Sequence, residues 1–108
     1  LGSRGLGDVY KRQMLDTKNQ LLGEKEITRG TVNATMISPR ELFLAALQFR
    51  AVHILLVHNH PSGIPEPSGD DITVTRQIRR AGEMLGITLL DHIIIGDHCY
   101  TSMLEQGI

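Results

Sequence analysis

The feature that most constrains this chain is a loop rich in proline and glycine between two strongly patterned segments. Residues 58–70 contain three prolines and two glycines, so neither a helix nor a strand ladder can continue through them. The apolar run at 51–57 before this loop is typical of a buried central strand. After it, Ser68 predicts a helix N-cap, with Asp70 and Asp71 in the first turn, where the helix dipole favours anions. The sequence therefore predicts a strand, a rigid loop and a helix in succession.

A second helix start lies upstream of this unit. Ser38 and Glu41 form a capping box, and Pro39 occupies the first helical position. Gly86 is expected to end the downstream helix as its C-cap. Helical spacing then gives each helix an apolar face. These predicted faces comprise Leu42, Phe43, Ala46 and Phe49 in the first helix, and Ile72, Thr75, Ile78 and Leu85 in the second.

The remaining patterns predict strands and turns. Asp16 and Asn19 mark a polar turn between two strands within residues 14–22, because such side chains hydrogen-bond to nearby backbone. The order of these elements predicts an α/β, sandwich-like domain around a mixed sheet. Further strands are expected at residues 31–37, 87–90, 92–95 and 99–103, with a turn at 96–98.

Composition excludes several classes of protein. The chain has 108 residues, the length of one domain, and a formal net charge of -1, which offers no general attraction for nucleic acid or an anionic membrane. Cys99 is the single cysteine, which excludes an internal disulfide and a multi-cysteine zinc site. The apolar runs are too short to span a membrane, and no secretory signal is recognised. We therefore expect a cytoplasmic protein.

The first thirteen residues differ from the rest of the chain. They contain four glycines and serines in total and show neither helical nor strand periodicity. Residues 5–13 are similar to translated adapter or linker sequence. We therefore expect a non-native leader at residues 1–13 and a single, N-terminally truncated domain at 14–108, the alternative being a native but poorly ordered N-terminus.

The loop also carries the side chains with the clearest chemistry. His58 and His60 are two residues apart at the end of the predicted strand, where side chains at i and i+2 leave the same face. Asp71, at the following helix start, can present a carboxylate to the same point, with Asp70 as its competitor. Two imidazoles and a carboxylate are ligands of a catalytic zinc with an open fourth position, and Fe²⁺ or Mn²⁺ are alternatives. A solvated pair of histidines at a strand end is the structural alternative.

The other histidines and Ser68 have more ordinary interpretations. His53 interrupts the apolar strand and is expected to be a satisfied interior or edge residue, and His98, in the predicted turn, is expected to be exposed. His92, beside Asp91, is expected to form structural hydrogen bonds, with orientation of a metal ligand as the alternative. Ser68 has two candidate roles: a helix cap, which contributes about 1 kcal/mol, or a hydrogen-bond donor to a developing oxyanion.

The order of these residues resembles a known motif. His-x-His-Pro followed by Ser-x-x-Asp, with ten residues between the second histidine and the aspartate, is the core of the JAMM motif of MPN/JAB metalloproteases. The sequence from His58 to Ser68 is similar to the bacterial RadC branch of that superfamily. The resemblance covers residues 14–108. Further matching blocks are Leu15-Asp16, Gly30-Thr31, Pro39-Arg40-Glu41 and residues 90–97.

The resemblance implies a fold, a metal and a reaction. The fold is the MPN/JAB, cytidine-deaminase-like, three-layer arrangement, with a mixed β-sheet flanked by helices. His58, His60 and Asp71 become the ligands of Zn²⁺, which selects Asp71 over Asp70, and Ser68 takes the oxyanion-stabilising role. In the family, a glutamate deprotonates a zinc-bound water for attack on a peptide or isopeptide carbonyl.

This sequence departs from the family pattern at that glutamate. By register it should fall near position 8, where Asp8 has a side chain one methylene shorter. Glu24 and Glu26 are alternatives, although a solvated strand face is the more ordinary role for both. RadC proteins commonly carry an N-terminal helix-hairpin-helix region, so the chain is expected to correspond to their C-terminal domain.

The sequence supports three functional hypotheses to different degrees. The leading hypothesis is a zinc-dependent metallohydrolase domain of the JAMM peptidase or isopeptidase type, in a RadC-like protein of a group historically linked to DNA repair. Its expected substrate is a peptide or isopeptide, without direct binding of duplex DNA. The alternative is a catalytically inactive metal-binding scaffold. A nuclease, suggested by His58-Asn59-His60, is disfavoured because HNH nucleases spread those residues over a ββα-metal fold.

Overall fold

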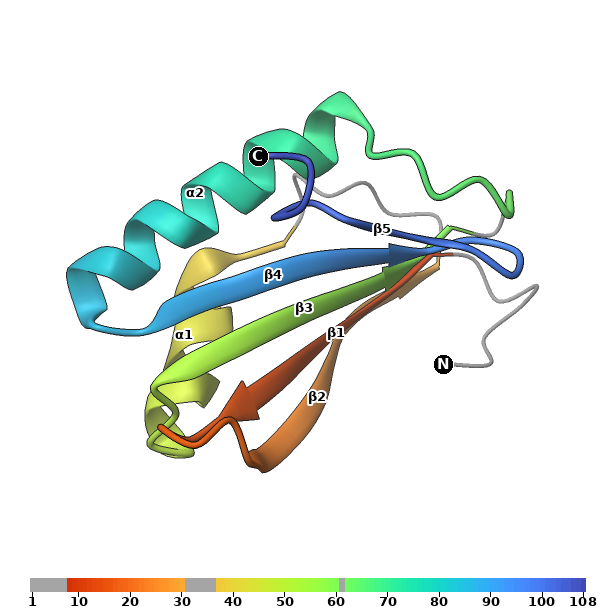
Figure 1. Ribbon diagram of the computed structural model, residues 1–108. Coiled ribbons are helices and arrows are strands. Elements are labelled where there is room, and N and C mark those ends of the chain that lie inside the picture. Colours follow the sequence, from red (N-terminus) through yellow and green to blue (C-terminus); the bar gives the residue numbers. More distant parts are fainter. Residues whose placement is uncertain (1–7, 31–36, 61) are drawn as a thin grey trace.

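A computed structural model of the chain describes residues 8–30, 37–60 and 62–108 (Figure 1). The strand predicted at 31–37 therefore lies outside the described residues except for Ile37, which is buried. The elements are β1 (Asp8–Leu15), β2 (Leu21–Gly30), α1 (Pro39–Gln48), β3 (His53–Asn59), α2 (Gly69–Leu85), β4 (Thr88–Ile95) and β5 (Tyr100–Ser102).

The five strands form one mixed sheet in the order β2-β1-β3-β4-β5. β3 and β4 are parallel and are joined by α2, whereas the other neighbouring strands are antiparallel. The apolar run that predicts a central strand forms β3, with a neighbour on each side. The predicted α/β class with a mixed sheet is confirmed. The strands predicted at 87–90 and 92–95 are one continuous strand, β4.

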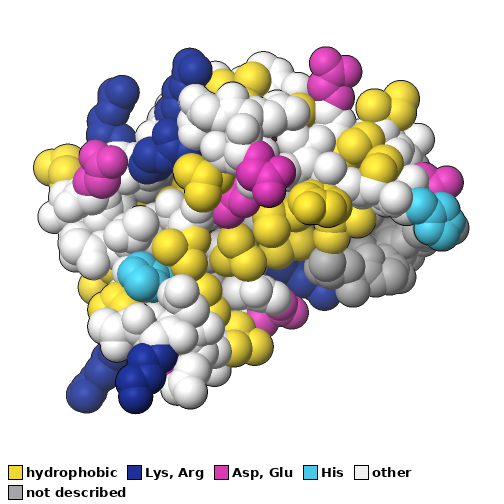
Figure 2. Space-filling view, in the orientation of Figure 1, with side chains coloured by type: hydrophobic (Ala, Val, Ile, Leu, Met, Phe, Trp, Pro, Cys, Tyr) yellow, Lys and Arg dark blue, Asp and Glu magenta, His cyan; other side chains and the backbone are white. Residues whose placement is uncertain are grey.

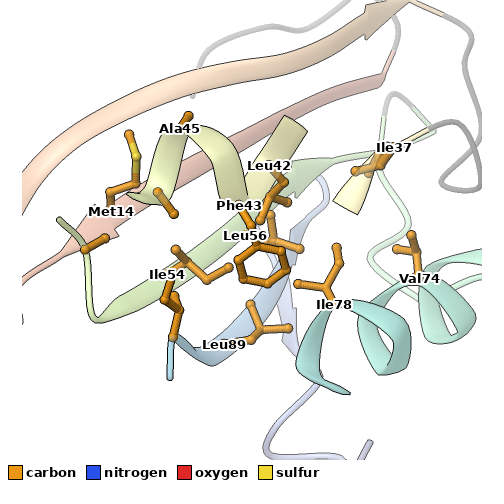
Figure 3. Close-up of a cluster of buried hydrophobic side chains, with 13 residues drawn as sticks. Met14, Ile37, Leu42, Phe43, Ala45, Ile54, Leu56, Val74, Ile78 and Leu89 are labelled. Atoms are coloured by element: carbon orange, nitrogen blue, oxygen red, sulfur yellow. The ribbon is translucent and has the colours of Figure 1, made fainter. Parts of the chain in front are cut away.

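Both helices pack on the same face of this sheet. Met14 of β1 lies opposite Ile54 of β3, and paired residues of neighbouring strands share a face. These side chains belong to one buried cluster with residues of α1 and α2 (Figure 3). Figure 2 views the opposite face, where apolar side chains lie across the middle. Of the predicted three-layer arrangement, the described residues contain two layers, the sheet and the helices on one of its faces. Neither α1 nor α2 has the length and apolarity needed to cross a membrane.

Two residues of the predicted helix faces are assigned wrongly. Phe49 lies beyond the last residue of α1 as its C-cap and is 37% exposed. Its ring packs over Gly23 of β2, where an added Cβ would lie 2.6 Å from a ring carbon. Leu85, the last residue of α2, is 50% exposed. The prediction for Phe49 is wrong because the helical period continues the apolar face past the end of α1. The prediction for Leu85 is wrong because the last turn of α2 extends beyond the buried cluster, to which Leu85 does not belong.

The end of α2 depends on close packing that the apolar pattern does not reveal. Gly86 has a left-handed backbone, with φ of 75°, and is the C-cap, as predicted. The turn places Ile87 in the core in place of Leu85. Gly82 packs against the Ile87 carbonyl, where an added Cβ would lie 2.1 Å from the oxygen. The absence of a side chain at Gly82 therefore lets the chain return beside the helix.

β1 begins within the stretch predicted to be a leader. The sequence predicts no strand at residues 8–13, but these residues pair with both β2 and β3. The strand is not recognised from the sequence because these residues are mostly polar and show no alternation of apolar and polar side chains. The backbone hydrogen bonds that pair β1 with both neighbours do not require such a pattern. Arg12 lies opposite Leu56 on the face that packs against the helices and is only 5% exposed. Burial lowers the pKa of its guanidinium. The domain boundary at residue 14 remains a prediction.

Candidate metal centre

The two histidines of the motif lie where β3 ends and the loop begins. His58 is 2% exposed and shares a face with Leu56, on the helix side of the sheet. The backbone N–H of His60 donates to the Ile95 carbonyl at 2.9 Å, which keeps the chain beside β4 after the strand ends. The two rings meet edge to face, with centroids 4.6 Å apart. Their spacing along the strand thus brings both imidazoles to one place, as predicted.

The carboxylate comes from the first turn of α2. Ser68 caps this helix: its Oγ accepts from the Asp71 N–H at 3.0 Å, and its own N–H donates to Asp71 Oδ2 at 2.9 Å. This reciprocal capping box holds the Asp71 side chain back toward the loop. Asp71 is 1% exposed, whereas Asp70 is exposed. The predicted capping role of Ser68 is therefore present.

These three side chains converge. The Oδ1 atom of Asp71 lies 3.4 Å from His58 Nδ1, and its Oδ2 lies 3.2 Å from His60 Nε2. One candidate ligand atom from each residue lies within 4.8 Å of the others, so the group could hold a metal ion. Imidazole nitrogens with a carboxylate oxygen, and no thiolate, are the donor set of zinc sites that keep a coordination position open.

The orientation of the His60 ring fits metal binding. Its Nδ1 lies 2.9 Å from the Ile64 carbonyl oxygen, which accepts hydrogen bonds only. The ring must therefore donate from Nδ1, which leaves the lone pair of a neutral imidazole on Nε2, facing Asp71. A carbonyl that fixes the tautomer of a histidine is the usual outer support of a metal ligand.

The other sequence candidates lie elsewhere. His53 Nδ1 lies 2.7 Å from Asn19 Oδ1, the expected satisfied role, and the side chain of His98 is 88% exposed, as predicted. Glu24 Oε2 accepts from Gln13 Nε2 at 2.8 Å on β2, in keeping with a partly solvated strand face. Glu26 lies in the same strand, opposite Lys11.

Asp8 is the first residue of β1, at the end of the sheet where the histidines lie. The next residue, Val9, pairs with Asn59, which stands between His58 and His60. The register therefore places the backbone of Asp8 beside the candidate metal centre.

Thr75 and His92 form a buried pair behind the centre. His92, with 0% exposure, has its Nδ1 2.7 Å from Thr75 Oγ1, and that hydroxyl donates to the Asp71 carbonyl at 2.7 Å. The structural hydrogen bonding predicted for His92 is thus confirmed. The His92 ring lies 6.0 Å from that of His58, centroid to centroid. Burial, and then proximity to His58, lowers the pKa of His92 to about 4. Thr75 was predicted only as part of the apolar helix face.

Comparisons with known proteins show which family the chain is similar to. A family model described as a RadC-like JAB domain matches residues 8–108. A UPF0758 protein of Shouchella clausii is 50% identical over 93 residues, which are 86% of this chain and 40% of that protein. A UPF0758 protein of Methanosarcina mazei is 50% identical over 93 residues, 86% of this chain and 41% of its own length. One of Alkaliphilus metalliredigens is 46% identical over 101 residues, 94% of this chain and 44% of its own. The chain thus spans about two fifths of the length of these relatives.

Proposed function

Since the chain belongs to the RadC-like JAB domain family, we propose that it is a zinc-dependent metallohydrolase domain of the JAMM type, which cleaves a peptide or isopeptide bond. The observation that carries the proposal is the convergence of His58, His60 and Asp71 in a buried group. Such a donor set leaves a coordination position for water or substrate. A structural zinc site would instead be closed by a fourth protein ligand.

The proposed hydrolase assigns separate roles to the three metal ligands and to Ser68. His58, His60 and Asp71 would hold the zinc ion, whose chemistry when bound is to polarise a carbonyl and to lower the pKa of a water molecule toward about 7. Ser68 uses a lone pair of Oγ to accept from the Asp71 N–H, so its hydroxyl proton remains available to an oxyanion. The helix cap and the oxyanion role of Ser68 are therefore compatible.

Asp8 is the proposed acceptor of the proton released from the attacking water. Its register beside the histidines supports this role. Its side chain is one methylene shorter than the glutamate of the family pattern, and a misplacement of about 1 Å can lower a rate about a hundredfold. We therefore expect weak hydrolysis from this chain as it stands.

A metal-binding scaffold without catalysis is the second candidate function. The residue at position 8 favours this alternative, because aspartate stands there in place of the expected glutamate. The two candidates agree on the metal and differ on turnover.

The experiment compares the parent chain with Asp8→Glu. Zinc content is measured first, followed by cleavage of peptide and isopeptide-linked substrates. A hydrolase predicts that Asp8→Glu raises turnover about tenfold to a hundredfold at unchanged zinc content. Asp8→Asn, which removes the base, should remove the residual activity. Zinc binding without turnover in Asp8→Glu would favour the scaffold, and a parent that binds no zinc would contradict both.

A further inference from the structure

We propose that Thr75 and His92 are positioning residues of the metal centre, which tie the first turn of α2 to β4 and so set the place of Asp71. The inference rests on the proposed metal site and deepens it. The pair does not touch the reacting atoms; it acts through the backbone of Asp71.

The contacts form a continuous chain across two elements. His92 lies on β4, where it pairs with Leu56 of β3. Leu56 is two residues before His58 on the same strand, so His92 and His58 lie on the same face of the sheet. The Nδ1 of His92 meets the Thr75 hydroxyl on α2 at 2.7 Å. That hydroxyl meets the carbonyl of Asp71, one turn earlier, at 2.7 Å. Thr75 and His92 are 1% and 0% exposed, so water does not compete for these bonds.

Counting protons gives the direction of each bond. A hydroxyl has one proton and two lone pairs, and a backbone carbonyl can only accept. The Thr75 proton therefore goes to the Asp71 carbonyl, while the sulfur of Met103, at 3.4 Å, is a weaker acceptor. The 2.7 Å contact with His92 then requires its Nδ1–H to donate. The structure thus assigns the Nδ1-protonated tautomer to His92.

This arrangement fixes Asp71 from two sides. Ser68 holds its carboxylate through the capping box, and Thr75 holds its carbonyl and links it to β4. The histidine ligands are carried by β3, which pairs with β4. The Thr75–His92 bond is therefore a direct polar link between the helix that carries the carboxylate and the sheet that carries the imidazoles.

The test measures zinc affinity by competition with a chelator for the parent chain, Thr75→Val, Thr75→Ser and the control Thr73→Val. Thr73 is exposed on the same helix, so its substitution makes the same chemical change without touching the pair. Loss of a hydrogen bond that supports a metal ligand costs about 10-fold to 100-fold in metal affinity, which is the loss expected for Thr75→Val. Thr75→Ser keeps the hydroxyl and should stay within about threefold of the parent. Circular dichroism checks that each variant is folded.

A second readout does not depend on metal. Nitrogen chemical shifts of the His92 ring in the metal-free chain should show Nδ1 protonated and Nε2 unprotonated. Protonation at Nε2 alone would overturn the assigned direction of the bonds.

The outcomes separate the two proposals. A parent that binds no zinc overturns the proposed function. A parent that binds zinc, together with Thr75→Val that binds as tightly as Thr73→Val, overturns this inference alone. If Thr75→Val does not fold, Thr75→Ser decides: an affinity loss of about tenfold or more, despite the retained hydroxyl, would contradict the hydrogen-bond account.

Discussion

Replacing Arg12 with methionine should make the domain more stable. Arg12 is 5% exposed in the row of β1 that faces the helices, beside Leu56. Its Nε has no hydrogen-bond partner among the residues that the structure describes. Methionine keeps a long, adaptable side chain in this position and removes the guanidinium, whose charged form burial disfavours.

The magnitude follows from the buried donor. An unsatisfied buried donor costs about 1–3 kcal/mol, and an apolar replacement removes that cost. Imperfect packing of the new side chain offsets part of the gain, so we expect the free energy of unfolding to rise by about 1–2 kcal/mol. With a urea m-value of about 1–2 kcal/mol/M, the unfolding midpoint should rise by about 1 M.

Equilibrium unfolding in urea, followed by circular dichroism, measures this change. Arg80→Met is the matched control, because Arg80 is exposed on α2 and arginine and methionine have similar helix propensities. The control should stay within about 0.5 kcal/mol of the parent. An Arg12→Met variant less stable than the parent would show that the guanidinium is satisfied, and would refute the reasoning.

Three further predictions concern the helix ends and the surface. Gly82→Ala should lower the free energy of unfolding by about 1–3 kcal/mol, although alanine favours helices, because its Cβ would meet the Ile87 carbonyl; a higher unfolding midpoint would contradict this. Ser68→Ala should cost about 1 kcal/mol through loss of the cap, and an unchanged urea midpoint would show that the cap contributes nothing. Duplex DNA should not bind even at low salt, because the net charge is -1; fluorescence anisotropy that shows binding at low salt and steep weakening with added salt would contradict this.

The parts of this fold that local chemistry determines could be predicted from the sequence. The capping residues Ser38 and Ser68 fix both helix starts, and Gly86 fixes the end of α2. That His58 and His60 lie near a carboxylate follows from strand alternation and a helix start beyond the loop, whereas the choice of Asp71 over Asp70 comes from the resemblance to the JAMM motif. These signals are local, so they do not depend on the rest of the fold.

The features that the sequence hides depend on long-range packing. β1 starts six residues before residue 14 because two neighbouring strands pair with it, although most side chains of residues 8–13 are polar. Thr75 meets His92 17 residues away, in a contact that exists only once α2 lies on β4. The apolar pattern of α2 gives no sign that Gly82 matters, yet its contact with Ile87 determines how closely the chain packs against the helix after the turn.

The most direct test of the metal centre is the zinc content of three purified chains: the parent, His60→Ala and His98→Ala. His60 Nε2 faces the carboxylate of Asp71, whereas His98 is exposed in the turn before β5. The parent and His98→Ala should each hold about one zinc ion per chain, and His60→Ala should lose most of it. Equal zinc contents in the two variants would contradict the assignment of the ligands.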